Sequence, residues 1–428
     1  MIDRPLRFCM ITTFYPPYNF GGDGIFVQRL SNELAKRGHY VDVIHCLDSY
    51  RMLAGQEAAG TYDDHPRVTV HGLKSRLGFL SPLATQQAGF PFFKAGRIRE
   101  ILEQPFDVIN YHNISLVGGP KVLELGTGIK LYTMHEYWLV CPTHVLFRFN
   151  RAPCRRPYCL SCSLWQRRPP QWWRYLGLLE SAAKHVDAFI ALSSFCEHQH
   201  REMGFSFPIV HLPGFVASPE AASLSTDEGP GDAEREPYFL FVGRLEKLKG
   251  PQTLIPVFRA HPQARLLIAG FGSYEPHLRR MAQGSANIQF MGQLDQGRLQ
   301  GLYKRAVALI IPSLCFEVFS LVTVEAFRQG TPVIARNLGA LAEVVQESSG
   351  GLLYNTAEEL WQAMDRLLGD APLRRELGEQ GYEAYRQNWT VEAHLERYFS
   401  LITELAARTS GRSLYKRIGP PSGLDAHG

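Results

Sequence analysis

Residues 310–335 read IIPSLCFEVFSLVTVEAFRQGTPVIA. An apolar run that ends at Pro312 predicts a strand, and a short loop that carries Glu317 follows it. A helix is predicted to begin near Ser320, because serine is well suited to cap a helix N-terminus. A second apolar run comes after this helix. The order strand, loop, helix, strand predicts parallel pairing, and it places a helix N-terminus, which favours phosphate, beyond the end of a strand.

The same alternation surrounds this stretch. Apolar runs separated by helical segments predict strands at 238–245, 265–272, 287–294, 307–313, 332–337 and 350–355. In FVGRLEKLKG (241–250) the strand ends at Gly243, and Arg244 and Lys249 follow it closely. Arginine offers a planar fork of donors and lysine a compact charge, a combination suited to a diphosphate. The alternative is that both cations are solvated on a surface turn.

A second α/β series fills the N-terminal half. A strand at 6–13 is followed by the Gly-rich loop PPYNFGGDG (16–24), a helix at 25–37 and a strand at 39–46. Further strands are predicted at 68–73, 107–112, 129–135 and 188–193. We therefore expect an α/β protein with two Rossmann-like, doubly wound domains that face a central cleft, in which ligands bind beyond the carboxyl ends of the strands.

The predicted domain organisation follows from these two series and from the composition between and after them. An Ala-, Ser-, Pro- and acid-rich stretch cannot pack and is predicted to be a linker. The expected units are an N-terminal domain at 1–215, the linker at 216–237, a second domain at 238–388, a C-terminal helix at 389–409 that crosses back to the first domain, and a tail at 410–428.

Composition excludes several classes of protein. The 428 residues are 45% hydrophobic and 20% charged, as expected for a globular chain. The net charge of +4 is too small to indicate a nucleic-acid partner. No run of eighteen apolar residues predicts a transmembrane helix, and the N-terminus does not look like a signal peptide. We expect a cytoplasmic protein, at most peripheral at the inner face of the membrane.

Several motifs in a fixed order resemble one enzyme family. They are FYPP and GG in the first loop, LAKRGHYVDVI, FVGRLEKLKG, IAGFG, the E-x7-E element ending in EAF, GTPVIA and LGALAEVV. Together they resemble the family 4 glycosyltransferases, which are retaining enzymes of the two-Rossmann GT-B fold. The resemblance covers most of residues 8–400. It implies an N-terminal acceptor-binding domain and a second domain that binds a nucleotide-sugar donor.

The resemblance also implies roles for matching residues. Arg244 and Lys249 would hold the donor diphosphate, Glu317 would meet the transferred sugar and Glu325 the ribose. His135, at a predicted strand end, would lie beside the reacting sugar; the alternative is a structural histidine beneath the cleft. The implied catalytic residues are His135, Glu317, Arg244 and Lys249. The implied donor-binding residues are Gly21, Gly22, Arg244, Lys249, Gly272, Glu317, Phe319, Ser320, Leu321 and Glu325.

The predicted reaction is sugar transfer from a nucleotide-sugar to a glycan or lipid-linked acceptor, in cell-surface polysaccharide or glycolipid biosynthesis. No Asp-x-Asp motif stands where the diphosphate would bind, so no catalytic metal is expected. The alternatives are a nucleotide-sugar epimerase of the same fold and a catalytically silent nucleotide-sugar-binding protein. The chain departs from the family pattern at Val318, Ser320, Ala340 and Ala342, which bears on the donor and on loop geometry.

A cysteine cluster interrupts the first domain at about 141–175. Cys141, Cys154, Cys159 and Cys162 have the spacing C-x12-C-x4-C-x2-C. Four clustered thiols in a reducing compartment favour a structural zinc site, which would fold a loop too polar to form its own core. An iron–sulfur cluster is a second interpretation, and unliganded or disulfide-bonded cysteines are a third.

The same segment is rich in arginine and aromatic residues. Residues 148–174 contain no Asp or Glu. The cations are Arg148, Arg151, Arg155, Arg156, Arg167, Arg168 and Arg174, and the aromatic residues around them are Phe147, Phe149, Tyr158, Trp165, Trp172, Trp173 and Tyr175. This composition favours contact with an anionic membrane surface. Two alternatives are a surface for an anionic acceptor and a solvated loop whose tryptophans pack on the domain. Nucleic acid is not an expected partner.

Overall fold

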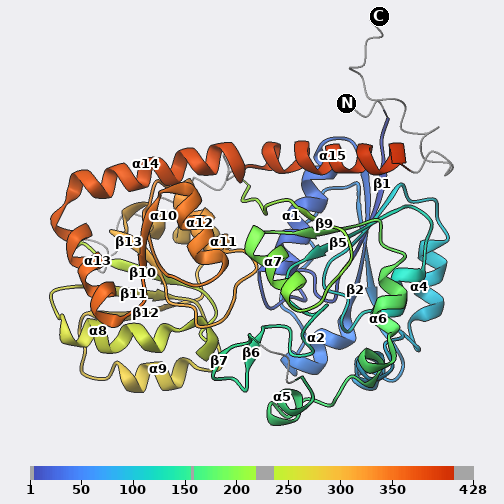
Figure 1. Cartoon of the computed structure of the whole chain (residues 1–428), viewed down its shortest axis with the longest axis horizontal. Helices are drawn as coiled ribbons and strands as arrows, with labels where there is room; N and C mark the ends of the chain where they lie inside the picture. The colour runs from blue at the N-terminus through green and yellow to red at the C-terminus, as the bar shows by residue number, and fades with distance from the viewer. Residues whose placement is uncertain (1–3, 156–158, 218–235, 409–428) are drawn as a thin grey trace, which may run out of the picture.

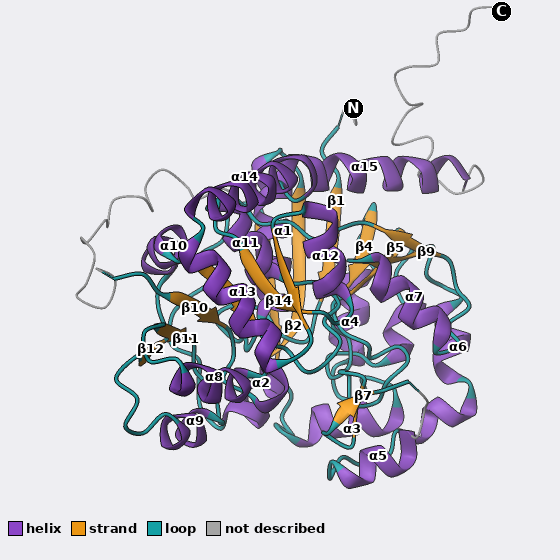
Figure 2. Ribbon diagram, turned by 60° about the vertical axis from the view of Figure 1, so that its left-hand side comes forward, coloured by secondary structure: helices purple, strands orange, loops and turns teal. Residues whose placement is uncertain are grey.

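A computed structural model describes residues 4–155, 159–217 and 236–408. Most of the predicted linker, the predicted tail, Arg156 and Tyr158 lie outside these ranges. Two parallel sheets stand side by side, each between layers of helices (Figure 1; Figure 2). The predicted α/β class with two Rossmann-like domains is therefore confirmed.

The first sheet has seven strands among the described residues, in the order β3-β2-β1-β4-β5-β8-β9, and all pairs are parallel. The strands are β1 (Arg7–Ile11), β2 (Tyr40–Cys46), β3 (Val68–Leu73), β4 (Val108–Tyr111), β5 (Ile129–Met134), β8 (Ala188–Ala191) and β9 (Ile209–His211). The sequence pattern missed the short strand β9.

Helices cover both faces of this sheet. Along β1, Phe8 and Met10 point into one hydrophobic core, and Cys9 and Ile11 into the other. Alternate residues of a strand face opposite sides, so helices on both faces leave the strand buried and its sequence continuously apolar. The helices and 3-10 turns of this domain are α1 (Gly22–Lys36), α2 (Leu47–Ala54), α3 (Leu80–Ala88), α4 (Ala95–Leu102), η1 (Pro120–Glu124), α5 (Cys159–Trp165), η2 (Trp172–Leu176), α6 (Leu178–Ala183) and α7 (Ser194–Glu202).

The second sheet has six parallel strands among the described residues, in the order β12-β11-β10-β13-β14-β15. They are β10 (Phe239–Val242), β11 (Leu266–Ala269), β12 (Ile288–Gly292), β13 (Ala308–Ile311), β14 (Val333–Arg336) and β15 (Gly351–Tyr354). The surrounding elements are η5 (Lys247–Lys249), η6 (Pro251–Thr253), α8 (Leu254–Ala260), α9 (Glu275–Met281), α10 (Gln296–Arg305), α11 (Leu321–Arg328), α12 (Ala340–Ser348), α13 (Ala357–Gly369) and α14 (Ala371–Asn388).

The C-terminal helix α15 (Val391–Arg408) lies against the first domain, although it follows the second domain in the chain (Figure 1). Leu395, Tyr398 and Ile402 belong to the same hydrophobic core as Phe8. The amide of Asn110 also donates to the Tyr398 hydroxyl over 3.1 Å. The buried apolar face of α15 therefore ties the end of the chain to the first sheet.

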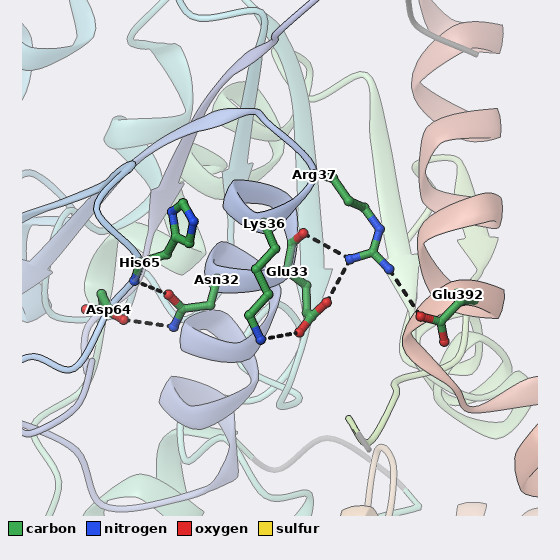
Figure 3. Close-up of polar contacts among 7 residues, drawn as sticks. All are labelled: Asn32, Glu33, Lys36, Arg37, Asp64, His65 and Glu392. Atoms are coloured by element: carbon green, nitrogen blue, oxygen red, sulfur yellow. Dashed lines mark hydrogen bonds and ion pairs between the residues drawn. The ribbon is translucent and has the colours of Figure 1, made fainter. Parts of the chain in front are cut away.

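Polar contacts at the surface add to this attachment (Figure 3). Arg37, which follows α1, contacts Glu33 at 2.7 Å and Glu392 of α15 at 3.2 Å. On another side of α1, the Asn32 amide donates to Asp64 over 3.0 Å. One end of α1 is thus tied to α15, and its middle to the loop before β3.

Val216 is buried, although the composition of the residues that follow it predicted that it belongs to the linker. Its N–H donates to the carbonyl of Trp389 over 3.0 Å, and its carbonyl accepts from the Tyr385 hydroxyl over 3.1 Å. The predicted linker therefore began too early, because contacts with the end of α14 hold this residue.

The Cys- and Arg-rich segment is partly packed and partly exposed. It contains the two-stranded hairpin β6 (Phe147–Arg148) and β7 (Ala152–Pro153), which the sequence pattern did not indicate, and then α5 and η2. Trp173 is buried, and the Arg174 guanidinium lies over the Trp173 and Trp138 rings at 4.6 and 5.1 Å. Burial lowers the pKa of Arg174 to about 10. Trp173 therefore follows the alternative in which a tryptophan of this segment packs on the domain.

No helix among the described residues combines the length and the apolar composition needed to cross a membrane.

Candidate active site

The implied site residues follow the carboxyl ends of strands in both sheets. In each sheet the chain builds strands outward on one side of the first strand and then on the other, so the strand order changes direction between β1 and β4 and between β10 and β13. Loops that leave neighbouring strands in opposite directions open a crevice at such a point, where ligands bind in open α/β sheets. Gly21 and Gly22 follow β1 and His135 follows β5; Arg244 and Lys249 follow β10, Gly272 follows β11, and residues 313–320 follow β13.

Lys249 and Glu317 form an ion pair between two loops of the second domain. The ammonium lies 2.7 Å from Oε1 and 2.9 Å from Oε2 of the carboxylate. The Ser313 hydroxyl donates to Oε1 over 2.7 Å. Both paired side chains are largely shielded from solvent, and charge-assisted hydrogen bonds are strong where water is excluded.

Their charges stabilise each other against burial. Burial alone raises the pKa of Glu317, but the charge and hydrogen bond of Lys249, together with the Ser313 hydroxyl and the charge of Arg244, outweigh it, so the pKa lies below its ordinary value. Burial alone lowers the pKa of Lys249, but Glu317 and the neighbouring Cys315 bring it above its ordinary value. The pair therefore stays ionised at neutral pH.

Close approaches between loops create this geometry. Gly250 has φ +78°, and a Cβ there would lie 2.0 Å from the Pro312 carbonyl oxygen. Only glycine fits, and it lets the loop after β10 touch the loop after β13, which brings Lys249 to Glu317. Gly272 is equally confined, because a Cβ there would lie 2.4 Å from the Leu245 carbonyl oxygen.

Arg244 is more exposed than Lys249. Its guanidinium contacts Glu246 at 2.9 Å, and 45% of its side chain is accessible. Its positive charge contributes to the lowered pKa of Glu317, so it belongs to the same electrostatic environment. The loop after β10 therefore carries two cations, the exposed Arg244 and the half-buried Lys249.

The E-x7-E helix begins one residue after the predicted cap. Ser320 occupies the N-cap position of α11, but its side chain accepts no backbone hydrogen bond; its hydroxyl instead accepts from Thr323 over 2.7 Å. The predicted start of the helix was therefore right, but the prediction that the Ser320 side chain caps it was wrong. The ring of Phe319 packs against Gly214, and a Cβ added to that glycine would lie 2.8 Å from the ring.

Glu325 links the two domains. Its carboxylate accepts from the Tyr303 hydroxyl over 3.2 Å and lies 3.6 Å from the guanidinium of Arg29 on α1. Nearby, a Cβ at Gly22 would lie 3.0 Å from the Leu321 side chain. The first loop of one domain and helix α11 of the other are therefore in contact, which places Glu325 at the domain interface.

His135 is half-buried in the first domain and lies beside the buried His112. Its Nε2 is 2.9 Å from Nδ1 of His112, and Phe26 packs edge-on at 4.9 Å between ring centroids. Burial lowers the pKa of His135 to about 4, although the charge of Asp23 opposes the shift. His135 is neutral at pH 7, so one ring nitrogen accepts and the other donates.

The first domain holds the loop that carries Glu317. The Tyr137 hydroxyl donates to the Glu317 carbonyl over 3.2 Å, and the Ser193 hydroxyl donates to the Val318 carbonyl over 2.8 Å. In return, the Glu343 carboxylate of α12 accepts the N–H groups of Ser194 and Phe195 at the start of α7, both over 2.6 Å. These contacts fix the two domains around the predicted site.

Sequence reasoning did not identify Arg29, His112, Tyr137, Ser193 or Glu343. Arg29 lies seven residues after Gly22 and therefore on the same helix face, a signal that was available. Glu343 lies within the motif LGALAEVV, but no role was assigned to it. His112, Tyr137 and Ser193 carry no local signal, because they reach the site only through contacts between segments far apart in the chain.

The four clustered cysteines line a different pocket, together with Thr143 and Met203. Within residues 4–155, 159–217 and 236–408, no group of three or more His, Cys, Asp or Glu side chains is close enough together to hold a metal ion as it stands.

Family models match both halves of the chain. The model described as Glycosyltransferase Family 4 matches residues 20–217, and the model described as glycosyl transferases group 1 matches residues 226–384. The glycogen synthase of Mycobacterium tuberculosis is 34% identical over 376 residues, which cover 81% of this chain and 82% of that protein.

Two further similarities are to a mannosyltransferase and to a solved structure. A GDP-mannose-dependent monoacylated phosphatidylinositol monomannoside mannosyltransferase of Corynebacterium glutamicum is 29% identical over 244 residues, 52% of this chain and 64% of that protein. The sucrose-phosphate synthase structure from Thermosynechococcus elongatus superposes with a TM-score of 0.73 at 22% identity, covering 94% of this chain and all of that one. The latter likeness shows the fold.

Proposed function

Because the chain belongs to the family 4 glycosyltransferases and has their GT-B fold, we propose that it transfers a sugar, with retention of anomeric configuration, from a nucleotide-sugar to a glycan or lipid-linked acceptor. The product would belong to a cell-surface polysaccharide or glycolipid. The relative from Corynebacterium, whose name gives GDP-mannose as donor and a phosphatidylinositol mannoside as acceptor, supports a lipid-linked acceptor.

The observation that carries this proposal is the half-buried Lys249–Glu317 pair in the loops that follow β10 and β13. The donor diphosphate would lie against Lys249 and Arg244, with the N-terminal N–H groups of α11 nearby. These groups are fixed before the substrate arrives, and preorganised charge of this kind is the largest single source of rate enhancement in many enzymes.

Glu317 has two roles in this proposal. It accepts two hydrogen bonds from the Lys249 ammonium, which holds the third N–H free to turn toward a phosphate oxygen. Its carboxylate would also accept a hydrogen bond from a hydroxyl of the transferred sugar. Glu325 of α11 would accept from the ribose once the donor separates it from Arg29.

The chemical step balances within the substrates. The bond between the anomeric carbon and the diphosphate oxygen breaks, and the acceptor hydroxyl oxygen bonds to the same carbon from the side on which the diphosphate leaves. The acceptor proton passes to the departing phosphate oxygen. Lys249 and Arg244 offset the developing negative charge, and neutral His135 would hold a sugar hydroxyl without adding charge to the oxocarbenium-like sugar.

An exposed apolar surface suits an acceptor embedded in a membrane. Trp165, Trp172, Tyr175 and Leu176 are all more than half exposed, and arginines surround them. Phe79, Phe92 and Phe93 are exposed on neighbouring segments, since the Trp173 indole donates to the Gln86 carbonyl of α3 over 2.8 Å. In the proposal this surface rests on an anionic membrane, since aromatic and cationic side chains combine well at lipid headgroups.

A donor screen tests the enzymatic proposal. The full chain is heated with a panel of nucleotide-sugars, and only a donor that binds the folded state raises the melting temperature. The stabilising donor is then incubated with the protein, and release of nucleoside diphosphate is followed by chromatography. A transferase releases it slowly without an acceptor, an epimerase changes the sugar, and a silent protein does neither. Nuclear magnetic resonance of a glycoside product reports its anomeric configuration.

A further inference from the structure

We propose that Cys141, Cys154, Cys159 and Cys162 bind one zinc ion as a closed four-thiolate site that stabilises this part of the first domain. The four residues come from the turn after β5, the residue after β7 and the first turn of α5. All four line one cavity of about 20 Å³, and none forms a disulfide. A cavity of this size is large enough for a single small occupant.

Backbone contacts bring the three segments together. The N–H of Cys154 donates to the Leu146 carbonyl over 2.6 Å, and the N–H of Cys141 donates to the Tyr137 carbonyl over 2.7 Å. Cys159 and Cys162 are three residues apart at the start of a helix, so their side chains share one face. Sequence spacing alone could not have shown that all four thiols meet at one cavity.

Hydrogen bonds to sulfur support a thiolate ligand. The Phe149 N–H and the Gln166 side-chain amide each donate to Sγ of Cys162 over 3.3 Å. A thiol sulfur is a weak acceptor, whereas a metal-bound thiolate carries charge that such donors stabilise. Two donors directed at one sulfur are therefore better explained by a ligand than by a buried thiol.

The surroundings have the charge that such a site requires. One Zn²⁺ with four thiolates has a net charge of 2 − 4 = −2. Arg148 lines the cavity, and the half-buried Arg174 donates over 3.2 Å to the carbonyl of Leu139, two residues before Cys141. Residues 148–174 include no acidic residue. This cationic environment offsets a dianionic centre.

The sulfurs must converge when the ion binds. They line the cavity, but no three ligating side chains of the described residues form a coordination sphere as they stand. Zinc–sulfur bonds of about 2.3 Å in tetrahedral geometry set the sulfurs about 3.8 Å apart. Binding would therefore tighten the segment that leads from Tyr137, which contacts the Glu317 loop, to the exposed helix α5.

Metal analysis of the purified full chain tests this proposal independently of sugar transfer. We expect about one zinc per chain by mass spectrometry, and four sulfurs at about 2.3 Å by X-ray absorption at the zinc edge. Cys159→Ser and Cys162→Ser should lose the metal. Cys46→Ser is the matched control: this buried thiol lies elsewhere and accepts from the Lys94 ammonium over 3.2 Å, so this variant should keep its zinc.

Several results would overturn the proposal. They are the absence of zinc from reduced protein refolded with the ion, zinc retained by Cys159→Ser, bound iron with equivalent sulfide, or disulfides among these cysteines by mass spectrometry. If the serine variants do not fold, the wild-type protein still decides the question. A mercurial reagent should release its zinc stoichiometrically while four thiols react together, and release of no zinc would contradict the site.

Discussion

The Lys249 ammonium lies within hydrogen-bonding distance of both carboxylate oxygens of Glu317, at 2.7 and 2.9 Å, although 68 residues separate them. Each residue follows a different parallel strand, and Gly250 allows the two loops to touch. The pair is ionised and shielded at neutral pH, so it presents a fixed cation and a fixed acceptor to whatever enters between the domains.

Replacing either member of this pair should abolish most of the transfer activity. For Lys249→Met and Glu317→Gln we expect kcat to fall by about 10²–10³-fold, the range for loss of one preorganised group that stabilises developing charge. Steady-state kinetics with the donor found in the screen measures the effect, and circular dichroism checks the fold.

The partly exposed pair Lys121–Glu124, at 2.7 Å, supplies the control for these variants. Lys121→Met should leave kcat within about two-fold, because ion pairs in contact with solvent contribute little. Near-normal kcat in both Lys249→Met and Glu317→Gln would remove the pair from the donor site.

Gly250→Ala should be far more destabilising than its backbone angle alone explains. Gly284 has a similar φ, +81° against +78°, but an added Cβ there meets nothing within 4 Å. Gly284→Ala should lower the free energy of unfolding by about 1 kcal/mol, the cost of a left-handed non-glycine residue. Gly250→Ala also places its methyl group on the Pro312 carbonyl, and we expect at least about 2 kcal/mol more.

Urea denaturation of both glycine variants measures the difference. Equal losses of stability would mean that the two loops are not in contact as described, and would weaken the argument for how Lys249 reaches Glu317.

Glu343→Ala should loosen the contact between the domains. Its carboxylate accepts the N–H groups of Ser194 and Phe195, so it caps helix α7 of the other domain. We expect a loss of about 1–2 kcal/mol in the free energy of unfolding, as for other helix caps, and a raised KM for the donor. Glu347→Ala, one turn further along α12 and exposed, should change neither quantity, and a similar effect in both variants would contradict the capping role.

Stability should fall as the pH is lowered from about 6.5 to 4. Burial lowers the pKa of His135 and of His394 to about 4. In this window the unfolded chain binds protons that the folded chain excludes, so each histidine removes about 1.4 kcal/mol per pH unit. Below pH 4 both states are protonated and the loss levels off.

His394→Gln tests this pH dependence by urea denaturation at pH 7 and pH 5. The variant should be less stable than the wild type at pH 7, because it loses a buried contact, but the difference between the two pH values should be smaller. An unchanged difference would show that His394 does not titrate as described.

The exposed tryptophan surface should bind anionic vesicles. Trp172 is 58% and Leu176 81% exposed. The double variant Trp172→Ser/Leu176→Ser should sediment with phosphatidylglycerol vesicles several-fold less than the wild type, and added salt should weaken binding of both, since screening acts on the surrounding arginines. Tyr382→Ser, at a 43% exposed aromatic residue of the second domain, should bind as the wild type does. Equal binding by the double variant would favour a solvated loop instead.

The sequence by itself determined the alternation of strands and helices, because strands covered on both faces are continuously apolar and are recognisable without tertiary information. It also indicated that Arg244, Lys249 and Glu317 would lie together, because the carboxyl ends of parallel strands necessarily lie at the same edge of a sheet. The resemblance to the family added Glu325 to this group. The two-residue strands β6 and β7 were too short to give a pattern.

Only the tertiary structure decided which of these residues touch and which distant segments complete the site. The Lys249–Glu317 pair depends on two loops meeting at Gly250, and Arg29, Tyr137 and Glu343 reach the site across the domain interface. It also decided that Arg174 packs against the rings of Trp138 and Trp173 while Trp172 is exposed, although positions 172 and 174 lie in one cationic stretch. Such contacts arise from the packing of segments far apart in the chain, so the local amino-acid composition does not predict them.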